Sequence, residues 1–384
     1  MIFYPDIFRD LFAAELFTRR QKVHAGYLRL MVLAGMLALM VDGGAHAQDS
    51  LSRLSMGADF LYRVDFITAE HQQPRNRQQF QVHARLNYAM QDNLTFIFQL
   101  RSGDTDPVAA KQAFTGGFSA KPVEIDIASM NWRPVEGLRI ISGKMQNPFY
   151  APRNTKLMWD VELRPEGVSA NYTLPAGAVD LFLNASHFWI QERSSNRDAM
   201  LSGGQARVQY QAEPARIMLG AGYYDYRNTK GFPTFYTVGD GVGNSLDASN
   251  NYLYDFNNIE LMSEITFSGL PLPLAFYGDY ILNIADDVTE NQAWIAGLAL
   301  GDCAGQGDFA LYYSFRRLER DSLMGAFNDS CFLGGGTNGK GHEMNAEYQV
   351  SEKVSLYATW FISRLGLDDG IDYNRVQMDF NYVY

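Results

Sequence analysis

Residues 79–101 read QFQVHARLNYAMQDNLTFIFQLR, and this stretch decides the fold. Apolar side chains occupy every second position over residues 80–88 and again over residues 94–100, and polar side chains fill most of the positions between them. A period of two is that of a β-strand with one apolar and one polar face. The short connection at residues 91–93 predicts a tight turn, so the stretch predicts a β-hairpin.

The same alternation recurs from residue 52 to the C-terminus and predicts an all-β protein. Many segments run for about 10 to 15 residues, longer than an average strand of about five or six and long enough to cross a bilayer at a tilt. We expect about 16 strands, at residues 52–69, 77–90, 94–103, 122–133, 137–146, 166–174, 178–192, 200–212, 215–228, 252–268, 272–286, 291–301, 307–320, 341–350, 353–365 and 373–384.

The lengths of the connections alternate along the chain. Every second connection is short, at residues 91–93, 134–136, 175–177, 213–214, 269–271, 302–306 and 351–352. The longest connections belong to the intervening set, at residues 104–121, 147–165, 229–251 and 321–340. Short turns at one end and long loops at the other are typical of outer-membrane barrels, whereas a soluble sandwich has no reason to sort its loops in this way. We therefore expect a transmembrane antiparallel β-barrel with short periplasmic turns and long extracellular loops.

The membrane then decides which face points outward. The apolar face meets lipid, the sheet closes so that every backbone group is paired, and the polar face lines a water-filled bore. The last strand has apolar side chains at alternate positions over residues 376–384 and ends on Tyr384. This pattern is similar to the signal read by the machinery that assembles outer-membrane barrels. We expect that machinery and outer-membrane lipid as partners.

Residues 1–47 predict an export signal. Basic side chains precede an apolar run over residues 30–41, and Ala45–His46–Ala47 fits a small-x-small cleavage site. The run is too short to cross a bilayer as a helix, although an uncleaved anchor is the alternative. We expect a cleaved signal peptide at residues 1–47, a barrel over residues 48–384, and residence in the outer membrane.

Strand parity assigns the side chains that line the bore. Basic residues concentrate on the early strands and acidic residues on the later ones, which would set up a transverse field across the water column. Scattered charges on a solvated polar face are the alternative. The candidate lumen-lining residues are Arg63, Arg85, Arg101, Arg207, Glu260, Glu264 and Asp279.

No strong catalytic or ligand-binding motif occurs in the sequence. The histidines after residue 47 lack metal-ligand spacing with another His or Cys. Residues 334–340 lack the spacing of a phosphate loop, and no Gly-x-Ser-x-Gly elbow is present. We expect no enzyme activity, no cofactor and no metal. The formal net charge of −11 argues against a nucleic-acid partner. An enzymatic or adhesive barrel is the alternative, which no site in the sequence favours.

One long connection differs from the others. Residues 143–172, GKMQNPFYAPRNTKLMWDVELRPEGVSANY, begin and end like strands, but Pro148, Pro152 and Pro165 exclude a strand in the middle. Charged side chains of both signs mix there with aromatic ones, and a loop of this length is usually functional. Its candidate residues are Arg153, Lys156, Trp159, Asp160, Glu162 and Arg164.

This region resembles the putative porin family of Gram-negative bacteria. The likeness rests on Gly143–Met145, Asn147–Phe149, Trp159–Asp160 and Arg164–Gly167, and it continues through Gly278–Tyr280, Ala293–Trp294, Phe327–Ser330, Gly334–His342 and Asp372–Gln377. It thus covers nearly the whole chain after residue 47.

The resemblance implies an outer-membrane porin, a channel for passive diffusion of small hydrophilic solutes or ions. A channel selective for an anion or a sugar, with a saturable binding site, is the alternative. By analogy with general porins, we expect residues 147–165 to fold into the barrel as a pore constriction, and we expect a homotrimer. A loop lying over the rim is the alternative.

Cys303 and Cys331 are the only cysteines. The first falls in a short turn and the second in a long loop, at opposite ends of a barrel. Because bridged Cα atoms lie within about 7 Å of each other, we expect no disulfide between them. The chain departs from the family at Cys331, where the resemblance implies an acidic residue.

Overall fold

We describe a computed structural model of the protein, which places residues 53–236, 239–368 and 370–384. The predicted signal peptide lies outside the described residues. The strands are β1 (Leu54–Ala69), β2 (Arg75–Gln91), β3 (Leu94–Ser102), β4 (Gln112–Ala113), β5 (Val123–Trp132), β6 (Leu138–Lys144), β7 (Glu166–Ala176), β8 (Val179–Gln191), β9 (Ala199–Ala212), β10 (Ala215–Arg227), β11 (Phe256–Phe267), β12 (Leu274–Asn283), β13 (Gln292–Gly301), β14 (Phe309–Leu318), β15 (Gly339–Ser351), β16 (Val354–Leu365) and β17 (Ile371–Val383).

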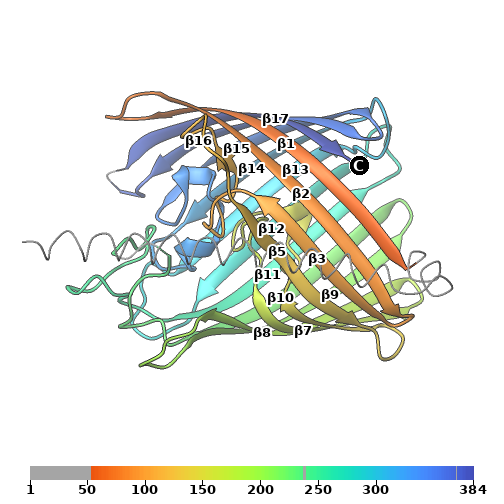
Figure 1. Ribbon diagram of the computed structural model, residues 1–384, viewed down its shortest axis with the longest axis horizontal. Coiled ribbons are helices and arrows are strands. Elements are labelled where there is room, and N and C mark those ends of the chain that lie inside the picture. The colour runs from red at the N-terminus through yellow and green to blue at the C-terminus, as the bar shows by residue number, and fades with distance from the viewer. Residues whose placement is uncertain (1–52, 237–238, 369) are drawn as a thin grey trace, which may run out of the picture. The chain divides into compact units, whose positions relative to one another are not determined.

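The wall of the barrel is one closed antiparallel sheet (Figure 1). β1 pairs with β17 from Asp59↔Val383 to Ala69↔Tyr373, so the first and last strands join. The two-residue β4 pairs with β2 inside a connection and is not part of the wall. The wall therefore has 16 strands, and the predicted 16-stranded antiparallel barrel is confirmed.

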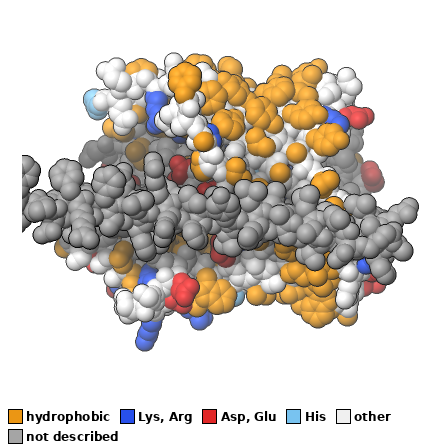
Figure 2. All heavy atoms as spheres, in the orientation of Figure 1, with side chains coloured by type: hydrophobic (Ala, Val, Ile, Leu, Met, Phe, Trp, Pro, Cys, Tyr) orange, Lys and Arg blue, Asp and Glu red, His pale blue; other side chains and the backbone are white. Residues whose placement is uncertain are grey.

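The barrel is apolar outside and polar inside. On β2 the side chain of Val82 is 39 % exposed, whereas that of the neighbouring Gln81 is only 5 % exposed. The same inversion occurs on β11, where Leu261 is 54 % exposed and Glu260 is only 1 % exposed. Figure 2 shows hydrophobic side chains gathered over the strands of the visible face. A surface of this kind suits hydrocarbon rather than water.

The connections differ at the two ends of the barrel. The ends of β2 and β3 are joined by residues 92–93 and those of β16 and β17 by residues 366–370, at opposite ends. The C-terminus lies at the right-hand end in Figure 1, with the short turns. Four long loops at the other end are named here L2 (103–122), L3 (145–165), L5 (228–255) and L7 (319–338).

In their described parts, the long loops contain three single turns of 3₁₀-helix: η1 (Pro152–Asn154) in L3, and η2 (Gly325–Phe327) and η3 (Phe332–Gly334) in L7. In the part of the chain that is described, no helix is long and apolar enough to cross a membrane.

An apolar core lies inside the barrel, between these loops and one side of the wall. L3, L5 and L7 contribute buried side chains such as Leu157, Phe235 and Phe327, and strands β8 to β14 contribute others such as Tyr224 and Ile281. A polar-lined bore does not by itself predict such a core.

The predicted strand at residues 252–268 is corrected by the structure at its start. β11 begins at Phe256, because Tyr252 belongs to L5 and packs on Phe235, with ring centroids 5.4 Å apart. The apolar pattern there reflects burial inside the barrel rather than a longer strand.

Candidate permeation site

L3 leaves the wall after β6 and rejoins it at β7. The backbone N–H of Met145 donates to the carbonyl of Pro165 at 2.9 Å, which joins the two ends of the loop. Just before this point Gly143 has a φ of 106°, and a Cβ there would lie 2.3 Å from the carbonyl oxygen of Ala128. Only glycine fits the place where the chain departs from the wall.

The first half of L3 is attached to the polar face of the strands that follow β7 in the sheet. Asn184 on β8 donates to the carbonyl of Pro148 at 3.1 Å. Gln205 on β9 binds the backbone of Tyr150 twice, accepting from its N–H at 3.0 Å and donating to its carbonyl at 2.9 Å. The hydroxyl of Tyr150 donates to Glu264 on β11 at 3.0 Å. L3 therefore lies against the inner face of the barrel rather than over its rim.

Basic side chains surround this attachment. The guanidinium of Arg207 lies 4.0 Å from the ring centroid of Tyr150 and 4.1 Å from that of Phe182, so it is held between two aromatic faces. Arg153 approaches Glu264 with an N–O distance of 3.8 Å. Arg207, predicted as a lumen-lining residue, thus supports L3 directly.

Aromatic rings continue the attachment from L3 into L5 and L7. Phe149 stacks on Trp159 with centroids 5.9 Å apart, and Trp159 stacks on Tyr226 of β10 at 6.4 Å. Tyr226 then stacks on Phe327 of L7 at 6.2 Å, and Phe327 stacks on Phe235 of L5 at 5.9 Å. This column joins three loops through one continuous set of apolar contacts, which we call the aromatic column.

L7 is a second inward-folded loop, which the sequence reasoning missed. The backbone N–H of Asp160 in L3 donates to the carbonyl of Phe327 at 2.8 Å, and the N–H of Ser330 donates to Asp160 Oδ2 at 3.1 Å. A signal was available, because a loop in water has no need of so many apolar side chains: Leu323, Met324, Phe327, Phe332 and Leu333.

Charged side chains surround the contact between L3 and L7, and ion pairs tie L7 to the wall. Arg316 on β14 binds Asp329 at 2.9 Å and also pairs with Glu343. Burial alone would raise the pKa of Asp329, but the facing Lys156 and Arg316 outweigh it and lower that pKa to about 2. Burial raises the pKa of Asp160, and the nearby Asp329 carboxylate adds to the rise. The pKa values of the two aspartates are therefore shifted in opposite directions, that of Asp329 downward and that of Asp160 upward.

The second half of L3 faces the early strands and L2. Glu162 forms an ion pair with Lys111 of L2, and burial lowers the pKa of Lys111 to about 7. Arg164 binds Asp126 of β5 at 3.1 Å, and Arg101 of β3 approaches the other oxygen of the same carboxylate at 3.2 Å. The carboxylate of Asp126 thus forms ion pairs with two guanidinium groups.

The other basic lumen candidates lie on the same side of the barrel. Arg63 of β1 binds Asp379 of β17 through two nitrogens, at 2.7 and 2.5 Å. Arg85 of β2 donates to the amide oxygen of Gln99 at 2.6 Å. Among the described residues, no carboxylate forms an ion pair with Arg85.

The acidic lumen candidates are covered by the inward loops. Glu260, Asp279 and Glu264 are 1 %, 4 % and 5 % exposed. Glu260 accepts hydrogen bonds from Tyr224 at 2.6 Å and Gln205 at 3.1 Å, while one oxygen of Asp279 has no hydrogen-bond partner among the described residues. These carboxylates face the loops and not open water.

Three of the cavities formed by the described residues lie along the polar inner face of the wall. An outer cavity of about 390 Å³ lies between β1, β2, β17, L2 and L7. A second, of about 300 Å³, lies between L3 and strands β12 to β17 and shares Arg63 with the first. A third, of about 580 Å³, lies at the short-turn end and is lined by Arg85, Arg133 and Arg139. Within the described residues no group of three or more His, Cys, Asp or Glu side chains is arranged to hold a metal.

A protein-family model described as "Putative porin" matches residues 59–240 and 242–383. The chain belongs to this family. A comparison of the porin with curated proteins finds no match.

Solved structures share the fold of this porin at low sequence identity. OprB of Pseudomonas putida, in a high-pH structure, matches at a TM-score of 0.60 and 9 % identity, covering 88 % of this chain and 96 % of that one. OmpF of Salmonella typhi, in complex with daunomycin, matches at a TM-score of 0.55 and 12 % identity, covering 86 % of this chain and 97 % of that one. The trimer form of OmpT of Vibrio cholerae matches at a TM-score of 0.52 and 10 % identity, covering 86 % of this chain and 99 % of that one.

Both cysteines of the porin are free in the structure. Cys303 lies in the turn at residues 302–308, whereas Cys331 is buried in L7. The sulfur of Cys331 accepts from Gln377 at 3.4 Å and lies 3.7 Å from a nitrogen of Arg63. The thiol therefore takes the acceptor position between two donors of the inner wall.

Proposed function

We propose that this porin is a water-filled channel for passive diffusion of small hydrophilic solutes or ions, with L3 as its constriction. The observation that carries the proposal is the course of L3, which is attached to β8, β9 and β11 while cavities stay open on either side of it. A solute that crosses the barrel has to pass this loop.

The residues of the proposed constriction differ in their roles. Arg153 and Arg164 lie at the wall beside Glu264 and Asp126, and they shape the edge of the passage. Lys156 borders the cavity beside L3 and contributes charge to the passage. Asp160 and Glu162 are 4 % and 7 % exposed and tie L3 to L7 and L2, and Trp159 fixes the loop by stacking. The remaining lumen candidates, Arg63, Arg85, Arg101 and Arg207, then line the passage or support its border.

The aromatic side chains of L3 do not favour a sugar-binding channel. A sugar ring needs an exposed aromatic face, but Phe149 and Trp159 stack on each other and are only 8 % and 7 % exposed. Tyr150 is covered on one side by Arg207. Charged groups remain as the chemistry that a solute meets.

Assembly follows from the same proposal. Outer-membrane lipid covers the exposed apolar band, and the assembly machinery reads the strand that ends at Tyr384. A homotrimer is supported by the similarity to OmpT, whose structure is a trimer form. Residues 1–47 serve as a cleaved signal peptide that directs export.

Single-channel recording in planar bilayers tests the proposed function. The full porin should give discrete conductance steps, and deletion of residues 150–163 should raise the step size roughly twofold or more, because conductance follows the open cross-section. Deletion of residues 115–119, an exposed segment of L2, is the matched control and should change nothing. A folded protein without steps contradicts the channel, and an unchanged step size after the L3 deletion contradicts the constriction.

A further inference from the structure

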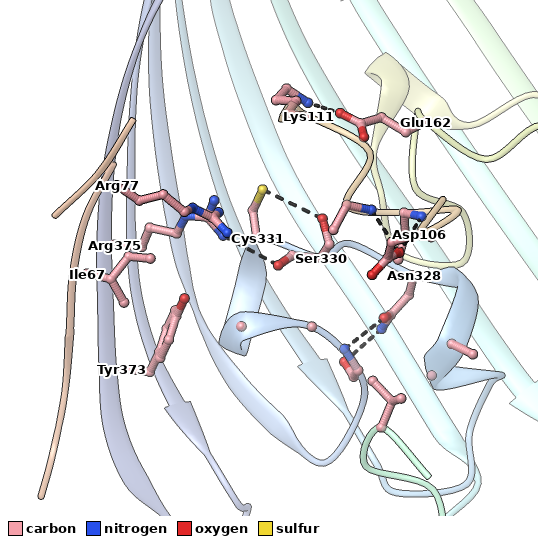
Figure 3. Close-up of a pocket in the computed structure, with 18 of the residues that line it drawn as sticks. Ile67, Arg77, Asp106, Lys111, Glu162, Asn328, Ser330, Cys331, Tyr373 and Arg375 are labelled. Atoms are coloured by element: carbon pink, nitrogen blue, oxygen red, sulfur yellow. Dashed lines mark hydrogen bonds and ion pairs between the residues drawn. The ribbon is translucent and has the colours of Figure 1, made fainter. Parts of the chain in front are cut away.

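The outer cavity carries an excess of positive charge. Its lining includes five basic side chains and two acidic ones, which are Arg63, Arg75, Arg77, Lys111 and Arg375 against Asp106 and Glu162. Figure 3 shows Arg77 and Arg375 extending from the wall toward Cys331 and Ser330 of L7. The excess is local, since the formal net charge of the whole chain is −11.

The ion pairs around this cavity leave part of the charge uncompensated. Asp65 binds Arg77 at 2.9 Å and Arg375 at 2.8 Å, so two guanidinium groups share one carboxylate. The second terminal nitrogen of Arg77 makes no hydrogen bond to any described residue. Arg75 forms no ion pair with the described part of the chain and is exposed. These donors are available to a ligand.

A buried acceptor faces the same space. Gln79 lines the cavity and is 4 % exposed, and its amide oxygen has no hydrogen-bond partner among the described residues. The amide nitrogen of Gln79 already donates to the carbonyl of Lys111 at 3.2 Å. A buried polar atom without a partner is costly, and the O–H of hydrogen phosphate, or a hydroxyl group on a carboxylate solute, would donate to it.

We propose that the outer cavity is a binding site for small carboxylate or phosphate anions, which concentrates them at the external entrance of the channel. Guanidinium groups match the geometry of carboxylate and phosphate oxygens. The volume of about 390 Å³ fits a small solute. The proposal rests on the channel function proposed above and names the class of solute that the channel takes.

The path beyond the site keeps a smaller excess of positive charge. The cavity that shares Arg63 with the outer one is lined by four basic side chains and three acidic ones, which are Arg63, Arg153, Lys156 and Arg316 against Glu343, Glu347 and Asp379. The cavity at the short-turn end is lined by Arg85, Arg133 and Arg139 against one acidic side chain, Asp92. An anion released from the outer site therefore meets further basic groups on its way inward.

Blocking of the single-channel current by inorganic phosphate tests the site. In potassium chloride at pH 7, phosphate added to the side of the long loops should block saturably, and neutral glucose at the same concentration should not. Arg77→Gln should raise the half-blocking concentration about tenfold, as expected for the loss of one charge-assisted hydrogen-bond donor. Arg133→Gln, which removes a similar charge at the other end of the barrel, should leave that concentration unchanged.

Calorimetric titration of the detergent-solubilised porin with phosphate makes the test independent of conductance. Saturable binding to the unmodified protein, weakened by Arg77→Gln and not by Arg133→Gln, supports the site. Normal conductance steps without phosphate block or binding contradict the anion site and leave the channel standing. Phosphate binding without conductance steps supports the site and contradicts the channel. Equal effects of the two substitutions would also contradict the site.

Discussion

The two sides of this barrel treat their charged residues differently. On the side of β8 to β14, the carboxylates of Glu260, Asp279 and Glu264 lie behind inward-folded loops and are almost fully buried. On the side of β1 to β6 and β17, arginines border the cavities that stay open. The composition of the whole chain is acidic, yet the outer cavity and the cavity at the short-turn end are lined by more basic than acidic side chains. Net charge is therefore a poor guide to selectivity when loops cover one wall.

A repeated arrangement produces the excess of positive charge on the side of β1 to β6 and β17. Asp65 forms ion pairs with Arg77 and Arg375, and Asp126 forms ion pairs with Arg101 and Arg164. In each case one carboxylate holds two guanidinium groups in place, and one positive charge is not neutralised. The carboxylates fix the positions of the arginines without cancelling their field.

The largest effect is expected from breaking the aromatic column. Trp159→Ala removes the ring that joins Phe149 to Tyr226, and a buried tryptophan of this kind contributes about 3–5 kcal/mol to the free energy of unfolding. Urea unfolding in detergent should show the loss, and single-channel records should become unsteady because L3 and L7 lose their shared support. Trp189→Ala is the control, since that side chain is 45 % exposed on the outer face. A loss no greater than that of Trp189→Ala would argue against the column.

A smaller effect should distinguish the two walls. Arg85→Gln removes one charge beside an open cavity, and Glu260→Gln removes one behind the loops. A unit charge about 4 Å away is worth about 1 kcal/mol in water, which is about fivefold in local ion concentration. The anion-to-cation permeability ratio should fall by up to that factor in Arg85→Gln and stay near its original value in Glu260→Gln. Similar changes in both variants would show that the acidic wall is accessible to ions.

The smallest expected effect is the response of the channel to a fall in pH. The pKa of Asp329 is about 2 and lies below its ordinary value, so its ion pairs contribute fully above pH 4 and are lost only as the pH falls through about 2. The pKa of Asp160 is raised, so this residue loses its charge earlier during acidification. Between pH 7 and pH 4.5 the step size should hold and the anion preference should rise slightly.

Asp160→Asn is the control for this pH dependence. It removes one of the groups that titrate, so the rise in anion preference on acidification should be smaller in the reversal potentials, and the rest of the rise should come from Lys111, whose pKa burial lowers to about 7. A closing of the channel within this pH interval would contradict the assignment, because it would require loss of the contact between L3 and L7.

Much of the wall could be predicted from the sequence, since side chains in a strand alternate strictly and lipid outside the barrel preserves that alternation. The turn at residues 92–93 and the closing strand β17 follow from the pattern alone. The interior could not be predicted in the same way. The fold of L7 depends on Phe327 meeting Tyr226, which lies about a hundred positions earlier in the chain, and no local period encodes that contact.

The sites show the same limit. Parity places Arg77 on the same face as Gln79, and Arg375 on the same face as Gln377. It does not reveal that both arginines converge on Asp65, because β17 meets β1 only when the barrel closes. Parity also cannot tell that Glu260 is covered by a loop.

The reversal potential of the unmodified porin in a gradient of potassium chloride tests the central claim most directly, namely that solutes pass along the basic wall. We predict a potential of the sign that chloride permeation produces, despite the acidic composition of the chain. A potential of the sign that potassium permeation produces would contradict the account, because it would mean that the buried carboxylates, and not the arginines, control the passage.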